Sequence, residues 1–357
     1  MLKSLIYISF IILFFNSCTK SEDLNVTSSP TVPSIKTGWD VPISQIVFTS
    51  NPPDRIQSID SPHFEFINNE NLKAYETAYV YLHKGIIKVY PENILAIHEI
   101  INDEINGHFF SLSLCPLTGS AIAWDRNIDG QVTEFGVSGH LFNDNLIPYD
   151  RNSNSYWSQM QFASIKGKYS GRILESEFLL KTLGSTIHAS FPDALVLVES
   201  GEHSCDSICY QSKGQWHNGR RPTGNKNSIL NNDYFGIIAK NIIHADEALL
   251  FSTNDFSNQI QIYQITYNNL KLVIIGSKSN SFITVFIDNT NIPNNEFYPI
   301  QDSLPLIMRD HLGNKYDIMG RAAEGPYLGS NLSSPPAYFA HQFAWNLFYP
   351  DNYTIFK

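Results

Sequence analysis

Short apolar or alternating runs, separated by turn-forming residues, recur along most of the chain. The runs are rich in β-branched and aromatic side chains, a composition that favours strands over helices. The predicted strands are Ala78–Leu82, Ile86–Tyr90, Phe109–Leu114, Ala121–Trp124, Val132–Val137, Leu195–Val198, Phe235–Ala239, Gln261–Thr266, Leu270–Ile275 and Phe282–Ile287. Asn127–Gly130 joins two of these runs and ends in the Asp-Gly pair that is typical of a hairpin turn.

Two segments show helical periodicity instead. Pro91–Glu104 carries Ile94, Leu95, Ile97 and Ile101 on one helical stripe, and Pro91 suits the first turn of a helix. A second helix is predicted to start at Pro335, with Ser334 as its cap, and to end before Pro350. The expected fold class is therefore α+β and β-rich.

Residues in the second part of the body repeat those of the first part at a constant offset. The pairs are Arg151 and Arg309, Gly167 and Gly325, Tyr169 and Tyr327, Gly171 and Gly329, Leu174 and Leu332, Pro192 and Pro350, and Asp193 and Asp351. Chance similarity between two β-rich stretches is the alternative, but the shared glycines favour an internal duplication. We therefore expect a first lobe at 46–200, a connector at 201–234 and a degenerate second lobe at 235–357.

The N-terminus has the parts of an export signal: Lys3, the apolar run Leu5–Phe15, and small or polar residues before Cys18. The apolar run is too short to span a bilayer. We expect 1–17 to be a lipoprotein signal peptide and 18–45 to be a lipidated tether, with acyl groups such as palmitate on Cys18. The alternative is an ordinary Cys18 behind a signal that the general peptidase cleaves.

The expected location is the bacterial cell envelope, with the protein as an outer-membrane lipoprotein that is periplasmic or surface-exposed. Acyl chains on Cys18 would hold it to the lipid bilayer without crossing it. Thr19–Asp23 resembles a signal that sends lipoproteins to the cell surface, which favours display there. The net charge is −10 and no basic stretch is present, so the sequence argues against a nucleic-acid partner.

With Cys18 assigned to lipid, the remaining cysteines are Cys115, Cys205 and Cys209. In an oxidising compartment this odd number leaves a thiol free, bound to metal or paired with another molecule. Cys205 and Cys209, with His203 and His217, offer the soft donors that suit zinc or copper. A Cys205–Cys209 disulfide is the alternative that an oxidising location favours.

Several short motifs follow one another in the first lobe. They are His98–Asp103, Cys115–Ala121, Asp125-Arg126, Gly136–Gly139, Tyr149–Arg151 and Trp157–Gln159. Their order resembles an uncharacterised family of exported prokaryotic proteins, domain of unknown function three thousand one hundred and seventy-nine, over most of residues 75–357. The resemblance implies no established activity. The family usually reads Cys-Pro-Leu-Cys-Gly, and Thr118 replaces the second cysteine here, so a local Cys-x-x-Cys pair cannot form.

Cys115 ends a predicted apolar strand just before a turn, where a thiol can act as nucleophile or ligand. The alternative is a small buried apolar residue. His98, on the predicted helix, and His140, after a glycine-containing segment, are its candidate partners, although each histidine also suits a structural role.

The leading functional hypothesis is an envelope-anchored binding module for a small ligand, with its site near Cys115, His98 and His140. The lack of a paired acid-base motif argues against an enzyme. One alternative is a copper- or zinc-binding protein that uses these three residues or the connector group around Cys205. Another is a cysteine-dependent hydrolase or acyl transferase in which a histidine activates Cys115.

Overall fold

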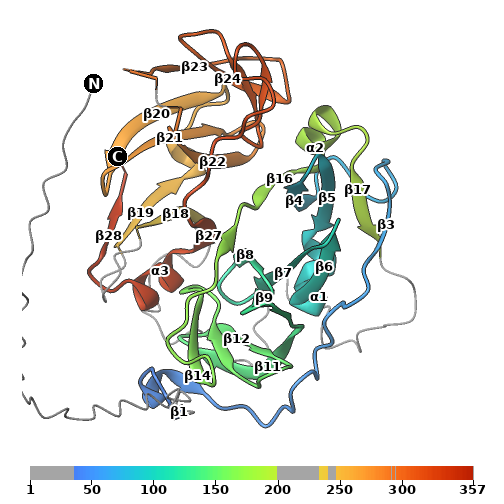
Figure 1. Cartoon of the computed structure of the whole chain (residues 1–357), viewed down its shortest axis with the longest axis vertical. Coiled ribbons are helices and arrows are strands. Elements are labelled where there is room, and N and C mark those ends of the chain that lie inside the picture. The colour runs from blue at the N-terminus through green and yellow to red at the C-terminus, as the bar shows by residue number, and fades with distance from the viewer. Residues whose placement is uncertain (1–35, 199–232, 240–246, 291, 294, 357) are drawn as a thin grey trace, which may run out of the picture. The chain divides into compact units, whose positions relative to one another are not determined.

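The structure is a computed structural model that describes residues 36–198, 233–239, 247–290, 292–293 and 295–356. The fold is α+β and β-rich, as the sequence predicts (Figure 1). The described α-helices are short, at seven residues each. Among the described residues, no helix has the length and apolar character needed to cross a bilayer.

Residues 36–198, called the first half below, contain these elements: β1 (Lys36–Trp39), η1 (Ile43–Gln45), β2 (Ile46–Val47), β3 (His63–Phe66), β4 (Thr77–His83), β5 (Ile86–Pro91), α1 (Glu92–His98), β6 (Ile100–Ile105), β7 (His108–Cys115), β8 (Ser120–Asp125), β9 (Asn127–Ile128), β10 (Gln131–Val132), β11 (Phe135–Phe142), β12 (Asn145–Asp150), β13 (Tyr156–Ser158), β14 (Ala163–Gly167), β15 (Ser176–Glu177), β16 (Leu180–Leu183), α2 (Gly184–Ser190) and β17 (Leu195–Val198).

The described residues from 233 onward, called the second half, contain these elements: β18 (Asp233–Ala239), β19 (Glu247–Ser252), η4 (Thr253–Asp255), β20 (Gln261–Tyr267), β21 (Leu270–Ser277), β22 (Phe282–Ile287), β23 (Phe297–Pro299), β24 (Leu306–Asp310), β25 (Lys315–Asp317), β26 (Ala322–Glu324), β27 (Ala337–His341), α3 (Gln342–Phe348) and β28 (Tyr353–Ile355).

Each half contains one mixed sheet and one antiparallel meander. The first mixed sheet has the order β16-β4-β5-β17-β3 and the second has the order β27-β18-β19-β28. The first meander is β15-β8-β7-β6 and the second is β20-β21-β22. The first half also has a six-stranded sheet, β1-β14-β13-β12-β11-β2, and the second half has the four-stranded sheet β23-β24-β25-β26.

The two mixed sheets share their connectivity. In each, two central strands pair antiparallel, and an edge strand (β16 or β27) pairs with the first of them (β4 or β18). The edge strand leads into a helix and then into a strand (β17 or β28) that pairs parallel with the second central strand (β5 or β19). Loop hydrogen bonds also recur at the predicted offset: the Leu174 N–H donates to the Phe162 carbonyl, and the Leu332 N–H donates to the Gly320 carbonyl. The internal duplication itself stays a prediction, and so do the lobe boundaries.

The hydrophobic cores link the two halves. One cluster lies between the first mixed sheet and the first meander, and another between the second mixed sheet and the second meander. A third joins the first meander and the six-stranded sheet to the second mixed sheet and α3. The fourth joins the second meander to the first mixed sheet. The meanders and mixed sheets therefore pack in a closed ring, and Lys36–Lys357 forms one compact unit.

The predicted strands are present except Val132–Val137, which is divided between β10 and β11. Thr133 and Glu134 lie in neither strand, because the Thr133 N–H donates to the Arg126 carbonyl instead. Both predicted helices also begin or end elsewhere. α1 ends at His98, because Glu99 adopts a left-handed conformation at φ 59° and Ile100 starts β6. In the second half, Ala337–His341 is a strand that pairs with β18, so α3 starts only at Gln342. In both segments, part of the apolar stripe that indicated a helix lies in a strand, β6 or β27, and is buried by sheet pairing.

Candidate functional site

Cys115 is the last residue of β7 and pairs with Ser120 across the β7–β8 hairpin. Its side chain is 1% exposed, and the Leu146 N–H donates a hydrogen bond to Sγ over 3.4 Å. Burial, with the nearby Glu99 carboxyl, raises the pKa of the Cys115 thiol, although hydrogen bonds from Thr118 and Leu146 act in the opposite direction. A neutral, enclosed thiol is a poor nucleophile and a poor metal ligand.

Buried polar side chains beside Cys115 form a continuous hydrogen-bond network. The Asn145 Nδ2 donates to Thr118 Oγ1 over 2.9 Å and to Ser120 Oγ over 3.0 Å. Ser120 Oγ donates to Gln159 Oε1 over 2.7 Å, and Gln159 Nε2 donates to the Ser113 carbonyl over 3.1 Å. The motif residues Thr118, Ser120 and Gln159, together with Asn145 and Ser113, therefore hold the first meander against the six-stranded sheet, and Thr118 takes part as an acceptor.

Glu99 is the C-cap residue of α1, and its carbonyl accepts from the N–H of Leu114, the neighbour of Cys115, over 2.8 Å. Its backbone is left-handed at φ 59°, and its N–H donates to the Leu95 carbonyl. Burial raises the pKa of the Glu99 carboxyl to about 8, although the residue as a whole is only partly buried. A strained backbone and a shifted carboxyl commonly mark functional sites, but both also occur in structural cores.

The structure gives His98 and His140 separate partners. His98 is 4% exposed, and its Nδ1 lies 2.8 Å from the Gln57 carbonyl. The Thr49 N–H donates to His140 Nδ1 over 3.4 Å, and the His140 ring stacks with Tyr156. Burial lowers the pKa of His140, and the Lys166 charge adds to this effect.

No metal cluster is found in the part of the chain that the structure describes, since no group of three or more His, Cys, Asp or Glu there could hold an ion. The predicted connector group of His203, Cys205, Cys209 and His217 lies outside the described residues, as does Cys18. A ligand site shared by Cys115, His98 and His140 stays a prediction.

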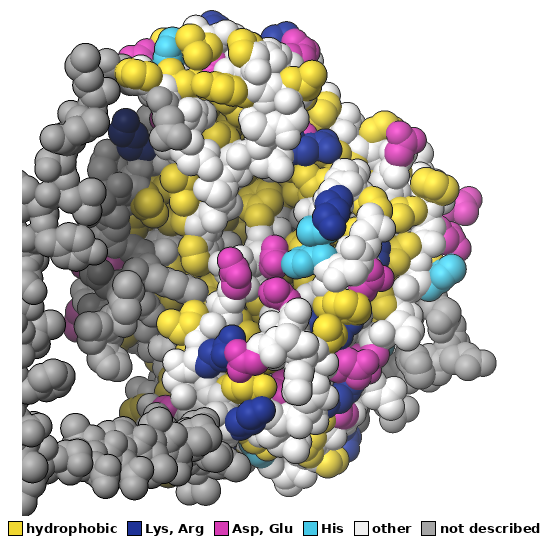
Figure 2. All heavy atoms as spheres, in the orientation of Figure 1, with side chains coloured by type: hydrophobic (Ala, Val, Ile, Leu, Met, Phe, Trp, Pro, Cys, Tyr) yellow, Lys and Arg dark blue, Asp and Glu magenta, His cyan; other side chains and the backbone are white. Residues whose placement is uncertain are grey.

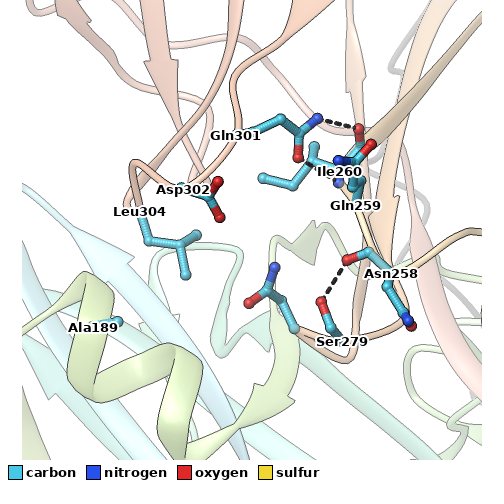
Figure 3. A pocket seen from close by; sticks show the side chains of 9 residues that line it. Ala189, Asn258, Gln259, Ile260, Ser279, Gln301, Asp302 and Leu304 are labelled. Carbon is cyan, nitrogen blue, oxygen red and sulfur yellow. Dashed lines mark hydrogen bonds between the residues drawn. The ribbon is translucent and has the colours of Figure 1, made fainter.

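A pocket of about 470 Å³ lies where α2 of the first half meets three loops of the second half (Figure 3). Its lining residues are Ala189, Asn258, Gln259, Ile260, Ser279, Asn280, Gln301, Asp302 and Leu304. Thr182 and Thr186 donate to the Asn280 carbonyl over 2.8 and 2.9 Å, and so fix the β21–β22 turn against α2. Contacts between the halves therefore hold the pocket walls in place.

The pocket lining is mostly uncharged and polar. The Gln301 side chain makes two hydrogen bonds to the Ile260 backbone. Gln301 Oε1 accepts from the Ile260 N–H over 2.9 Å, and Gln301 Nε2 donates to the Ile260 carbonyl over 2.8 Å. Figure 3 shows the Leu304 and Asp302 side chains facing this group across the pocket. Asp302 is the ionisable residue of the lining.

Sequence reasoning did not identify this pocket. Its residues come from turns rich in Asn, Gln and Ser, which at the sequence level indicate only loops. On the face drawn in Figure 2, acidic, basic and histidine side chains are interspersed, and some of all three kinds lie close together near its centre. That face therefore has no patch of a single charge sign that would indicate a charged partner.

The fold and the buried hydrogen-bond network define the class. It is a β-rich α+β protein in which side chains from the successive sequence motifs hold the first meander against the six-stranded sheet. Residues 53–352 match the family model described as protein of unknown function (DUF3179), and the chain belongs to that family. The resemblance drawn from the motifs is thereby confirmed. Comparisons with curated proteins and with solved structures gave no match.

Proposed function

We propose that the protein is a binding protein that takes a small neutral sugar in the pocket between α2 and the second half. The observation that carries the proposal is the pocket itself. Its volume of about 470 Å³ lies within the range of small-molecule sites. Amide and hydroxyl groups line it, and these groups can both donate to and accept from sugar hydroxyls.

The lining also suits the apolar face of a sugar. Ile260, Leu304 and Ala189 supply hydrocarbon surface, and Asp302 supplies a carboxylate that disfavours an anionic ligand. The buried, protonated Cys115 thiol supports binding over the cysteine-dependent hydrolase or acyl transferase, and over a metal site at Cys115. Copper or zinc in the connector remains an alternative.

The same proposal includes the anchor. Acylated Cys18 would hold the protein in the outer membrane of the cell envelope, with the ordered body on a tether. Labelling cells with a palmitate analogue tests this part. We expect label on the wild-type chain and none on Cys18→Ser.

Calorimetric titration with glucose, galactose and N-acetylglucosamine tests the binding site, with glucuronate as the anionic comparison. Leu304→Trp places a large ring at the pocket wall, whereas Leu312→Trp adds the same ring at a residue that is 48% exposed and outside the lining. We expect a neutral sugar to bind wild type and Leu312→Trp equally, and Leu304→Trp to lose binding. Absence of binding by every neutral sugar, or equal binding to Leu304→Trp, would overturn the proposal.

A further inference from the structure

His341 lies where the β7–β8 turn of the first half meets β27 and α3 of the second half. It is the last residue of β27 and the N-cap of α3, two elements labelled in Figure 1. Its Nδ1 lies 2.6 Å from Asp233 Oδ1 on the paired strand β18. This hydrogen bond places the proton of a neutral imidazole on Nδ1 and leaves a lone pair on Nε2. Among the described residues Nε2 has no hydrogen-bond partner, and the side chain is 22% exposed.

The loop that follows Cys115 fixes the imidazole from the other side. The His341 N–H donates to the Thr118 carbonyl over 2.8 Å. The ring lies directly against Gly119, where an added Cβ would be only 2.8 Å from Cε1. A residue larger than glycine would therefore displace the ring.

Further charged groups surround Asp233. Lys181 Nζ on β16 lies 3.5 Å from Asp233 Oδ2 and 3.5 Å from Glu92 Oε1 on α1. The Tyr79 hydroxyl on β4 donates to the same Glu92 oxygen over 3.1 Å. Burial alone would raise the pKa of Asp233, but the His341 hydrogen bond and the Lys181 charge hold it below its usual range. Asp233 therefore stays ionised and keeps the ring oriented.

The fold does not require a histidine and a carboxylate at these positions. In the first half, Leu183 is the N-cap of α2 and pairs with Thr77, as His341 caps α3 and pairs with Asp233. A leucine and a threonine thus satisfy the same structural position. The imidazole and the carboxylate call for a different explanation, and an oriented, partly exposed base is the arrangement that proton transfer needs.

We propose that His341 is the general base of a hydrolytic site for small neutral carboxylic esters, with Asp233 as its positioning residue. Two carboxylates, Asp233 and Glu92, outnumber the one ammonium of Lys181, so the site disfavours an anionic substrate. This activity goes beyond sugar binding and does not depend on it.

In the proposed reaction, Nε2 accepts a proton from water as the water oxygen bonds to the ester carbonyl carbon. The tetrahedral intermediate collapses, and the bond from the carbonyl carbon to the alkoxy oxygen breaks. The imidazolium returns its proton to the leaving alkoxide. The products are a carboxylic acid and an alcohol, and no oxidant or reductant takes part.

Hydrolysis of p-nitrophenyl acetate by the full-length protein tests the site. General-base catalysis contributes about 10²–10⁴-fold, so we expect His341→Gln to lose roughly 100-fold of the rate above background. His63→Ala removes an exposed histidine on β3 and serves as the matched control, with an unchanged rate. Equal hydrolysis by His341→Gln and the control would overturn the proposal.

Two readouts separate catalysis from a structural role. Asp233→Asn should lower kcat with little change in KM, because the ring loses its orientation but the substrate is still bound, and Asp233→Glu should restore part of kcat; an unchanged kcat in Asp233→Asn contradicts the assignment of Asp233. Diethyl pyrocarbonate acylates an unprotonated imidazole nitrogen, and mass spectrometry of the wild-type protein needs no variant. We expect His341 to be modified in the folded protein, and an unmodified His341 under conditions that modify His63 would overturn an accessible Nε2.

Discussion

The Leu146 N–H donates to the Cys115 sulfur, so a strand of the six-stranded sheet, β12, contacts the buried thiol at the end of β7 in the first meander. With 1% of the side chain exposed and a raised pKa, this thiol is screened from reagents in the folded protein. We expect 5,5′-dithiobis(2-nitrobenzoate) to leave Cys115 unmodified at neutral pH and to react once the chain is unfolded in urea. Rapid reaction in the native state would show an open site.

Gln159→Ala is expected to lower the free energy of unfolding by about 1–3 kcal/mol, because it leaves buried partners of the network without a hydrogen bond. Gln159 is 1% exposed and serves both Ser113 and Ser120. Gln131→Ala, at an exposed position on β10, is the control and should change stability little. Urea denaturation of the three proteins measures the difference, and equal midpoints would contradict a stabilising network.

Gly119→Ala tests the contact between the halves. Both Gly119 and Gly107 have positive φ, at 65° and 80°, but a Cβ at Gly107 would meet nothing within 4 Å. Alanine at Gly107 therefore measures the backbone cost alone, about 1 kcal/mol. We expect Gly119→Ala to cost more, and the excess to disappear when His341 is also replaced by Ala. An excess that persists in this double-mutant cycle would place the clash elsewhere.

The stability of the protein should depend on Glu99 in a defined pH window. Its pKa is about 8 in the folded chain and about 4.5 in the reference state, so the native state binds more protons between these values. Stability therefore falls as the pH rises from 4.5 to 8. Glu99→Gln should flatten this part of the profile and exceed wild type in stability at pH 8. Urea midpoints from pH 4 to pH 8.5 provide the measurement.

Cys18→Ser is expected to move the protein from the membrane fraction to the soluble fraction, because the acyl chains supply the membrane affinity. Immunoblots of fractionated cells measure the distribution. A variant that stays with the outer membrane would contradict anchoring through Cys18.

The strands could be predicted because their signal is local: β17 and β22 have the bounds that the apolar runs indicate. The helix over Pro91–Glu104 was only partly right, because pairing of Ile100 and Ile101 with β7 depends on residues further along the chain. Apolar periodicity alone does not distinguish a short helix that leads into a strand from one longer helix.

The sites were harder to predict than the fold. The end of a strand at Cys115 was expected, but its burial results from packing against the six-stranded sheet. Asp233 and His341 meet only through the register of β18 and β27, and the pocket residues meet only when three distant loops reach α2. Such meetings depend on tertiary contacts that no local pattern encodes.

The ring of core clusters means that neither half can bury its apolar faces alone. If each half were produced separately, its mixed sheet and meander would be left with surfaces that only the other half covers. The two pieces should therefore be insoluble apart and complement each other when mixed, and cleavage within 201–234 should leave them associated. By the same reasoning, two copies of the chain could exchange halves without loss of any core contact.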